Sequence, residues 1–157
     1  MESNGEKDGN ADKGAAVTDS DATVRLKSLD KWPLPVRIPL PPCFINAAGS
    51  IQNLLEEPCG GVAIIRSKAG SIRSNHYHKT DAHWLFVLSG CMHYFEREIG
   101  EQSVPEPVIL HAGEMVYTPP LVEHATLFTE DTVLISMSKH ARTHEAHEAD
   151  LVRVKVI

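Results

Sequence analysis

Positive charge and long apolar segments are both scarce in this sequence. Of its 157 residues, 15 are Lys or Arg and 21 are Asp or Glu, which gives a formal net charge of −6. The basic residues are scattered, so the chain lacks the basic patch through which proteins bind nucleic acid or an anionic membrane surface. No apolar run approaches the roughly 20 residues that a membrane-spanning helix needs. We therefore expect neither a nucleic-acid nor a membrane partner.

Cysteine is also rare. The three cysteines, Cys43, Cys59 and Cys91, are widely spaced and form no CxxC pair, which argues against a thiolate metal site or a redox motif and fits a reducing compartment. The first residues, MESNGEKDGNADKG, have neither the basic nor the apolar region of a signal peptide. These features predict a cytoplasmic protein.

Aromatic residues are missing from the beginning of the chain. Residues 1–22 are rich in Gly, Asp, Glu, Ser and Asn, and this composition predicts a disordered acidic tail. The remainder, residues 23–157, has the length of a single domain. Its first part holds a short run, Val24–Trp32, that is a candidate to dock onto the domain. The Pro-rich segment KWPLPVRIPLPPC follows and predicts extended chain with turns.

Short apolar runs separated by turn residues fill the chain from Gly60 onward, a pattern typical of an antiparallel sandwich or barrel. The runs are GVAIIRS, HWLFVLSG, CMHYFERE, PVILHAG, EMVYTPP, HATLFT, DTVLISMSK and VRVKVI. Trp84–Leu88 is apolar on both faces, which predicts a central strand. The one helical candidate is HARTHEAHEAD, in which His140, His144 and His147 would share a face. The pattern therefore predicts an all-β fold.

Histidines make Gly70–Gly90, GSIRSNHYHKTDAHWLFVLSG, the most informative stretch. His76 and His78 are separated by one residue, so on a strand both imidazoles project to the same face and can grip one ion. His83 opens the next apolar run, and the short connection KTDA could bring it beside this pair. His124 follows a Pro-Pro turn at the head of another strand. Local spacing alone leaves open whether it joins the others.

These residues resemble the two motifs of the cupin superfamily. The first motif, G-x5-H-x-H-x4-E-x6-G, matches Gly70, His76, His78 and Gly90 in register, with His83 at the place of the usual Glu. The resemblance covers roughly Gly60 to Ser138 and implies a jelly-roll barrel, the cupin-type double-stranded β-helix.

The second motif, G-x5-P-x-G-x2-H, matches Gly113, Pro119 and His124. Leu121 replaces its second Gly, which implies a different turn at this point. The stretch Cys91–Ala112 has a plausible length for the hairpin that joins the two motifs in cupins.

The resemblance implies a metal site. In metal-binding cupins the two His and the Glu of the first motif and the His of the second are the ligands, which corresponds here to His76, His78 and His124, with His83 in the fourth place. Asp81 competes for that place, because it is near in sequence and offers a hard oxygen. Imidazole ligands suit one divalent transition metal among Zn, Fe, Ni, Mn, Co and Cu. A metal-free histidine pocket is the alternative.

Three further residues are candidates for acid–base catalysis. Tyr94 and Tyr117 could donate a phenolic proton, because a nearby cation can lower the pKa of a tyrosine; packing is the commoner role of such residues. His93 could face the barrel interior as an acid or base, or form hydrogen bonds on the exterior.

Two segments, FINAAGSIQNLL and SNHYHKTDAHWLFVLSG, look like the RmlC-like branch of cupins, the nucleotide-sugar epimerases and ketoisomerases. This resemblance implies an isomerase or epimerase that acts on a sugar or oxo-compound, and a homodimer. A non-haem metal-dependent dioxygenase or lyase is an alternative, because three or four histidines around a metal ion also serve oxygen chemistry in cupins. A non-catalytic module that binds a small ligand or metal is the third hypothesis.

Overall fold

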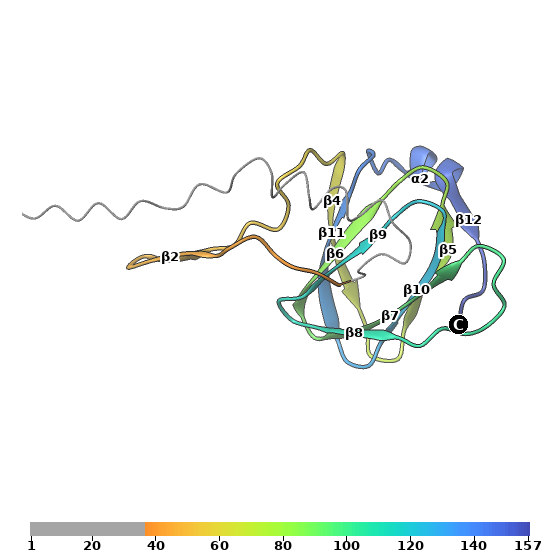
Figure 1. Cartoon of the computed structure of the whole chain (residues 1–157), viewed down its shortest axis with the longest axis horizontal. Coiled ribbons are helices and arrows are strands. Elements are labelled where there is room, and N and C mark those ends of the chain that lie inside the picture. Colours follow the sequence, from red (N-terminus) through yellow and green to blue (C-terminus); the bar gives the residue numbers. More distant parts are fainter. Residues whose placement is uncertain (1–36) are drawn as a thin grey trace, which may run out of the picture. The chain divides into compact units, whose positions relative to one another are not determined.

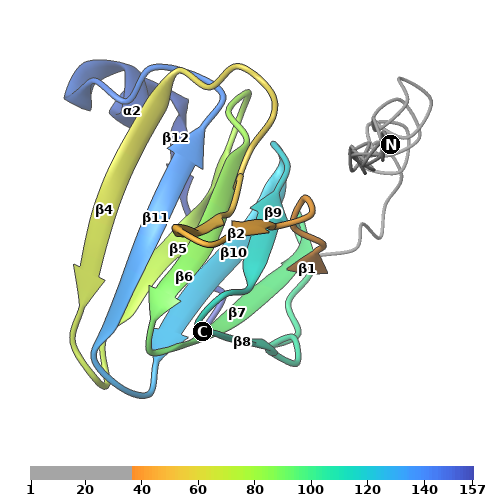
Figure 2. The same cartoon turned by 90° about the vertical axis from the view of Figure 1, so that its left-hand side faces the viewer.

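The computed structural model describes residues 37–157, which form two facing antiparallel sheets and a small hairpin (Figures 1 and 2). The first sheet has the order β1-β9-β6-β11-β4, with bounds Arg37–Ile38, Met115–Thr118, His83–Ser89, Thr132–Ser138 and Gly61–Ser67. The second has the order β12-β5-β10-β7-β8, with bounds Leu151–Arg153, Ile72–His78, Val122–Phe128, Cys91–Glu98 and Val108–His111. The hairpin joins β2 (Phe44–Asn46) and β3 (Gly49–Ile51). The predicted tail, residues 1–22, and the run Val24–Trp32 lie outside the described residues.

The strand pairing confirms the predicted double-stranded β-helix. Working outward from the β7–β8 pair, β6 pairs with β9, β5 with β10 and β4 with β11, each time antiparallel. The chain is thus a long two-stranded ribbon, wound so that successive pairs alternate between the two sheets. Additional pairing of β11 with β6 and of β10 with β7 joins the turns of the ribbon into sheets.

A buried apolar core lies between the two sheets. Its buried members are Leu85, Val87, Met92, Tyr94, Leu110, Val116, Phe128 and Leu134. Alternate residues of β6 face opposite ways, so Trp84 and Phe86 lie instead in an outer cluster with Met115 and Met137. Residues Ile38, Leu40, Leu54 and Leu55 pack against that cluster. The near-continuous apolar run of β6 is explained because one face of the strand contacts the core and the other contacts this cluster. His83 shares the inward face with Leu85.

A bulge in β5 redirects the chain just before the first histidine. Ser74 and Asn75 have left-handed backbone angles, φ 66° and 57°, and the register with β10 shifts between His124 and Ala125. The Asn75 side chain stabilises this bulge, because its Oδ1 accepts hydrogen bonds from the backbone N–H groups of Val156 and Ile157 at 2.8 and 3.2 Å. Bulges of this kind re-aim the side chains that follow them.

Leu121 retains the backbone conformation of a glycine. Its φ is 62°, in the left-handed region that costs a non-glycine residue about 1–2 kcal/mol. Its N–H donates to the His78 carbonyl at 2.8 Å. Loss of the motif glycine therefore does not remove the left-handed residue from this turn, and the turn stays tied to a predicted ligand strand.

The C-terminal helix is shorter than the predicted HARTHEAHEAD segment. Helix α2 spans His144–Asp150, and the side chain of its N-cap Thr143 accepts a hydrogen bond from the Ala146 N–H. The chain then enters β12, which pairs with β5 so that Leu151 lies opposite His78. Within residues 37–157, no helix has the length and apolar character needed to cross a bilayer.

Candidate metal centre

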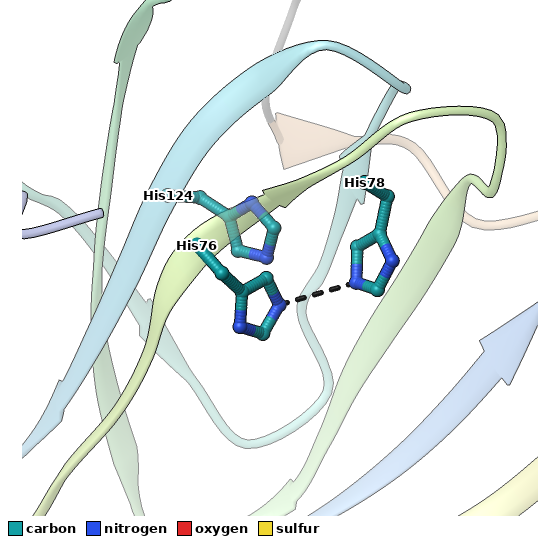
Figure 3. Close-up of side chains that lie close together, drawn as sticks. All are labelled: His76, His78 and His124. Carbon is teal, nitrogen blue, oxygen red and sulfur yellow. Dashed lines mark hydrogen bonds between the residues drawn. The ribbon is translucent and has the colours of Figure 1, made fainter. Parts of the chain in front are cut away.

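Three imidazoles from two strands converge inside the barrel (Figure 3). His76 and His78 come from β5 and His124 from β10, and each offers one ring nitrogen within 4.8 Å of the others. The Nε2 atoms of His76 and His78 are 3.1 Å apart, and the ring centroids of His76 and His124 are 4.6 Å apart. Pairing of His124 with His76 across the sheet produces this proximity. The structure thus brings together three of the four predicted ligands.

His83 lies in a second, overlapping group. Its ligand nitrogen, a nitrogen of His78 and a carboxylate oxygen of Asp81 lie within 4.8 Å of one another. The ring centroids of His83 and His78 are 4.2 Å apart, and His83 Nε2 is 3.4 Å from Asp81 Oδ2. Both candidates for the fourth ligand, His83 and Asp81, are therefore next to His78, and neither is favoured over the other by position.

Hydrogen bonds outside the cluster orient two of its rings. His78 Nδ1 lies 3.0 Å from Asp150 Oδ2, and His124 Nδ1 lies 3.0 Å from the Val122 carbonyl. With Nδ1 as the donor in both cases, the Nε2 lone pairs are left for the interior. His83 Nε2 is buried and has no hydrogen-bond partner within the described part of the chain. An unsatisfied buried nitrogen is costly, and a transition metal would satisfy it; the donor set therefore fits such an ion.

The cluster favours neutral imidazoles. Burial, helped by the neighbouring imidazoles, lowers the pKa of His76 to about 2 and of His124 to about 4. Burial is also the main cause that holds the pKa of His78 and of His83 below the usual value. Metal ligation requires the neutral form of histidine, so these side chains are ready to bind an ion at neutral pH without losing protons.

The space beside the histidines is small but adjoins a wider groove. A cavity of about 60 Å³ is lined by all four histidines together with apolar core residues and the polar residues Arg73, Ser74, Thr118, Thr126, Ser136 and Arg142. An open groove of about 600 Å³ lies along β5, α2 and β12. His76 lines both the cavity and the groove, so a ligand in the groove can reach the cluster with one end.

Of the predicted acid–base residues, only Tyr94 lies near the cluster. It is fully buried, its ring stacks with His124 at a centroid distance of 6.2 Å, and its hydroxyl is 2.7 Å from Thr118 Oγ1. Burial raises the pKa of Tyr94 well above its usual value. Thr118 lines the cavity, so the Tyr94 hydroxyl contacts a residue of the cavity wall without lining the cavity itself.

The other two candidates face away from the barrel interior. His93 lies opposite Leu127, which packs in an outer cluster with Phe95. Tyr117 packs against Trp84, with ring centroids 5.2 Å apart, on the outside of the first sheet. Both directions follow from strand alternation, because the neighbours Tyr94 and Thr118 face inward. The structure does not bring His93 or Tyr117 to the histidines.

Four residues near the cluster were not singled out as site residues from the sequence. Glu96 lies opposite His124 on β7, and burial raises its pKa to about 7. Arg142, His147 and Asp150 come from the C-terminal segment; the ring of His147 is 5.3 Å from that of His78. Glu96 could have been indicated by strand alternation, because it lies two residues after Tyr94 and so on the same face of the strand. His147 could have been indicated by the helical face that it shares with His140 and His144. No local signal in the sequence points to Arg142 or Asp150.

Asp150 is expected to support metal binding through His78. Replacement by asparagine removes the carboxylate that accepts from His78 Nδ1, and loss of such outer partners typically costs on the order of 10- to 100-fold in metal affinity. Competition with a chromophoric chelator measures the affinity. Glu148→Gln is the matched control, because Glu148 is on the same helix but pairs with exposed Arg153. Equal affinity in Asp150→Asn and the wild-type protein would mean that His78 needs no such orientation.

Comparison with known proteins agrees with the fold. Residues 63–138 match the family described as Cupin domain, so the described residues form a cupin fold. No curated protein sequence matches the chain.

Several solved structures share this fold at low sequence identity. The 3,4-ketoisomerase QdtA from Thermoanaerobacterium thermosaccharolyticum, in complex with TDP, is 20% identical with a TM-score of 0.58, covering 75% of this chain and 84% of that one. The 3'-monoepimerase ChmJ from Streptomyces bikiniensis, in complex with dTDP-quinovose, is 18% identical with a TM-score of 0.60, covering 74% and 67%. The capsular polysaccharide assembling protein CapF from Staphylococcus aureus is 23% identical with a TM-score of 0.51, covering 75% of this chain but only 35% of CapF.

Proposed function

We propose that this cupin domain is a metal-dependent enzyme that isomerises or epimerises a sugar or related oxo-compound. His76, His78 and His124 would hold the ion, with His83 or Asp81 as the fourth ligand. The observation that carries the proposal is the convergence of neutral imidazoles, two of them oriented by Nδ1 contacts, on the wall of a cavity. When bound there, a divalent ion supplies Lewis-acid polarisation of a carbonyl and stabilises an enolate.

Proton transfer falls to a chain of hydrogen bonds that ends at the cavity wall. The Glu96 carboxyl is hydrogen-bonded to Tyr94, and the Tyr94 hydroxyl to Thr118 Oγ1. A group with a pKa of about 7 can both take and give a proton near neutral pH. We assign Glu96 as the group that holds the proton and Tyr94 and Thr118 as the path by which it reaches the cavity.

The dimensions of the site support a substrate held in two places. The cavity accommodates only the reacting end of a sugar, whereas the groove has the volume of ordinary ligand pockets. Because ChmJ and QdtA were solved with a dTDP-sugar and with TDP, a nucleotide-linked sugar is the first substrate class to test. Its nucleotide would occupy the groove, where Lys155 is an exposed cation and Arg153 pairs with Glu148.

Deuterium exchange distinguishes the proposed reaction from oxygen chemistry. The metal-loaded protein is incubated in D₂O with a dTDP-linked oxo-hexose and with free ketoses, and NMR and mass spectrometry follow the carbon beside the carbonyl. We expect deuterium at that carbon without oxygen consumption, and none with the His124→Ala variant. Oxygen uptake by the Fe(II)-loaded protein would instead support the dioxygenase hypothesis.

We further propose that the chain forms a homodimer through the β2–β3 hairpin. This hairpin projects from the barrel (Figure 1), and its Phe44, Ile45 and Ile51 are 58%, 74% and 62% exposed. Such a concentration of exposed apolar side chains is typical of an interface. Sedimentation velocity should give a dimer for the wild-type protein and a monomer for Ile45→Asp. A monomeric wild-type protein would contradict the proposal.

A further inference from the structure

Arg142 places an unpaired positive charge in the cavity that the histidines line. It belongs to the segment between β11 and α2, which lies at the end of the barrel (Figure 1), and it is half-buried. Its Nη1 donates to the buried Ser136 Oγ at 2.8 Å. Among the described residues, no carboxylate oxygen lies within 4.0 Å of its guanidinium. Buried arginines are normally paired; this half-buried one is attracted by the Asp81 carboxylate but forms no ion pair with it.

The backbone that carries Arg142 is fixed in place. The His140 N–H donates to Asp81 Oδ1 at 2.9 Å and the Lys139 N–H donates to the Ala82 carbonyl at 3.0 Å. A side chain at Gly60 would lie 2.5 Å from the His140 carbonyl carbon, and one at Gly61 would lie 3.1 Å from Arg142 Cγ. Two consecutive glycines thus allow the segment to cross β4 closely and hold Arg142 over the cavity.

The charges around the cavity leave room for an anion. Arg142 and the proposed divalent ion are both cationic, and their repulsion in a partly dry cavity is unfavourable unless an anion lies between them. Of the nearby carboxylates, Asp81 lies beside His83 and attracts Arg142 from beyond 4.0 Å, and Asp150 binds His78, Thr80 and the Asp81 N–H. A carboxylate of the ligand, placed between Arg142 and the ion, would offset the repulsion between these two cations.

We propose that Arg142 binds a carboxylate of the substrate, so that the enzyme acts on an acidic sugar or oxo-acid whose carboxylate lies next to the reacting carbon. This inference rests on the proposed function, which it narrows to an anionic substrate class. A guanidinium matches the planar carboxylate with two parallel hydrogen bonds.

Oxalate, a small dicarboxylate, is the probe for the test, and uncharged oxamide is its isosteric control. Titration calorimetry is carried out on the Co(II)-loaded and the metal-free protein, and the visible Co(II) spectrum reports changes at the ion. Arg142→Gln should weaken oxalate binding on the order of 10- to 100-fold without lowering Co(II) content, as expected for loss of a charge-assisted contact. Arg142→Lys, which keeps the charge, should lose less. Arg66→Gln, an exposed arginine on β4, is the matched control and should bind as the wild-type protein does.

The outcomes separate this inference from the proposed function. If Arg142→Gln binds oxalate as tightly as the wild-type protein, or if inorganic phosphate or oxamide binds more tightly than oxalate, the carboxylate assignment is overturned. If the wild-type protein takes up no Co(II), the metal-dependent function fails, and the carboxylate assignment is then tested by the titration of the metal-free protein alone. Oxalate binding that depends on Arg142 then supports the anion site, and its absence overturns it.

Discussion

Replacement of His124 by alanine is expected to abolish the stabilisation that a divalent metal gives this domain. An ion that binds only the folded state stabilises it by about 2.7 kcal/mol when its concentration is 100 times its Kd. His124 supplies the ligand from β10, and without it only the two histidines of β5 remain in this group of three. Differential scanning calorimetry with and without added Zn²⁺ should show a rise of several degrees in the Tm of the wild-type protein and none in the variant.

His76→Ala should behave in the same way, because His76 faces both His78 and His124. Both variants should fold into less stable barrels. His111→Ala is the control, since His111 is exposed on β8 and outside the cluster, and its metal response should equal that of the wild-type protein. Retention of one equivalent of metal by His124→Ala or His76→Ala would contradict the proposed ligand set.

The metal-free domain is expected to be less stable at pH 5 than at pH 7, because burial keeps its histidines neutral. The pKa of His76 is about 2 and that of His124 about 4 in the folded state, against about 6.5 in an unfolded chain. At these two histidines the unfolded state therefore binds more protons below pH 6.5, so their contribution to stability falls as the pH falls. The Glu96 carboxyl, whose pKa is raised to about 7, offsets part of this fall. Each histidine contributes a slope of about 1.4 kcal/mol per pH unit, or roughly 2 kcal/mol at pH 5. The slope for His124 ends near pH 4.

Urea unfolding at pH 7.5 and pH 5.0 in the presence of a chelator measures this effect. The free energy of unfolding of the wild-type protein should be markedly lower at pH 5.0, and His124→Asn should lose part of that difference because it removes one of the titrating groups. Stability that is the same at both pH values would show that the imidazoles are not held neutral by burial.

Strands β4 and β6 to β11 could be predicted from the sequence because each carries a short apolar run, whereas β5 has few apolar residues and is absent from these runs. The runs from GVAIIRS to DTVLISMSK correspond to strands of the barrel, and the HxH spacing places His76 and His78 on one face of β5. The position of His124 depends on pairing between β10 and β5, which spacing alone does not determine. The match to the two motifs supplied that information.

The C-terminal contribution to the site could not be predicted in the same way. Arg142, His147 and Asp150 lie more than sixty residues after His78 in the sequence. They come close to the histidines because β12 pairs with the edge of β5 that β10 leaves free, and this pairing holds the preceding helix α2 beside His78. No pattern in HARTHEAHEAD indicates that its Asp would orient a distant His. By contrast, the outward direction of His93 and Tyr117 follows from strand alternation, once Tyr94 and Thr118 are known to face inward.

The most direct measurement is a crystal structure of the metal-reconstituted protein, with anomalous diffraction data collected on both sides of the absorption edge of the metal. One strong anomalous peak should lie between the Nε2 atoms of His76, His78 and His124, within bonding distance of all three, and its contacts should decide between His83 and Asp81. A peak at another place, or no peak after reconstitution with Zn²⁺, Co²⁺ and Fe²⁺, would contradict the metal centre.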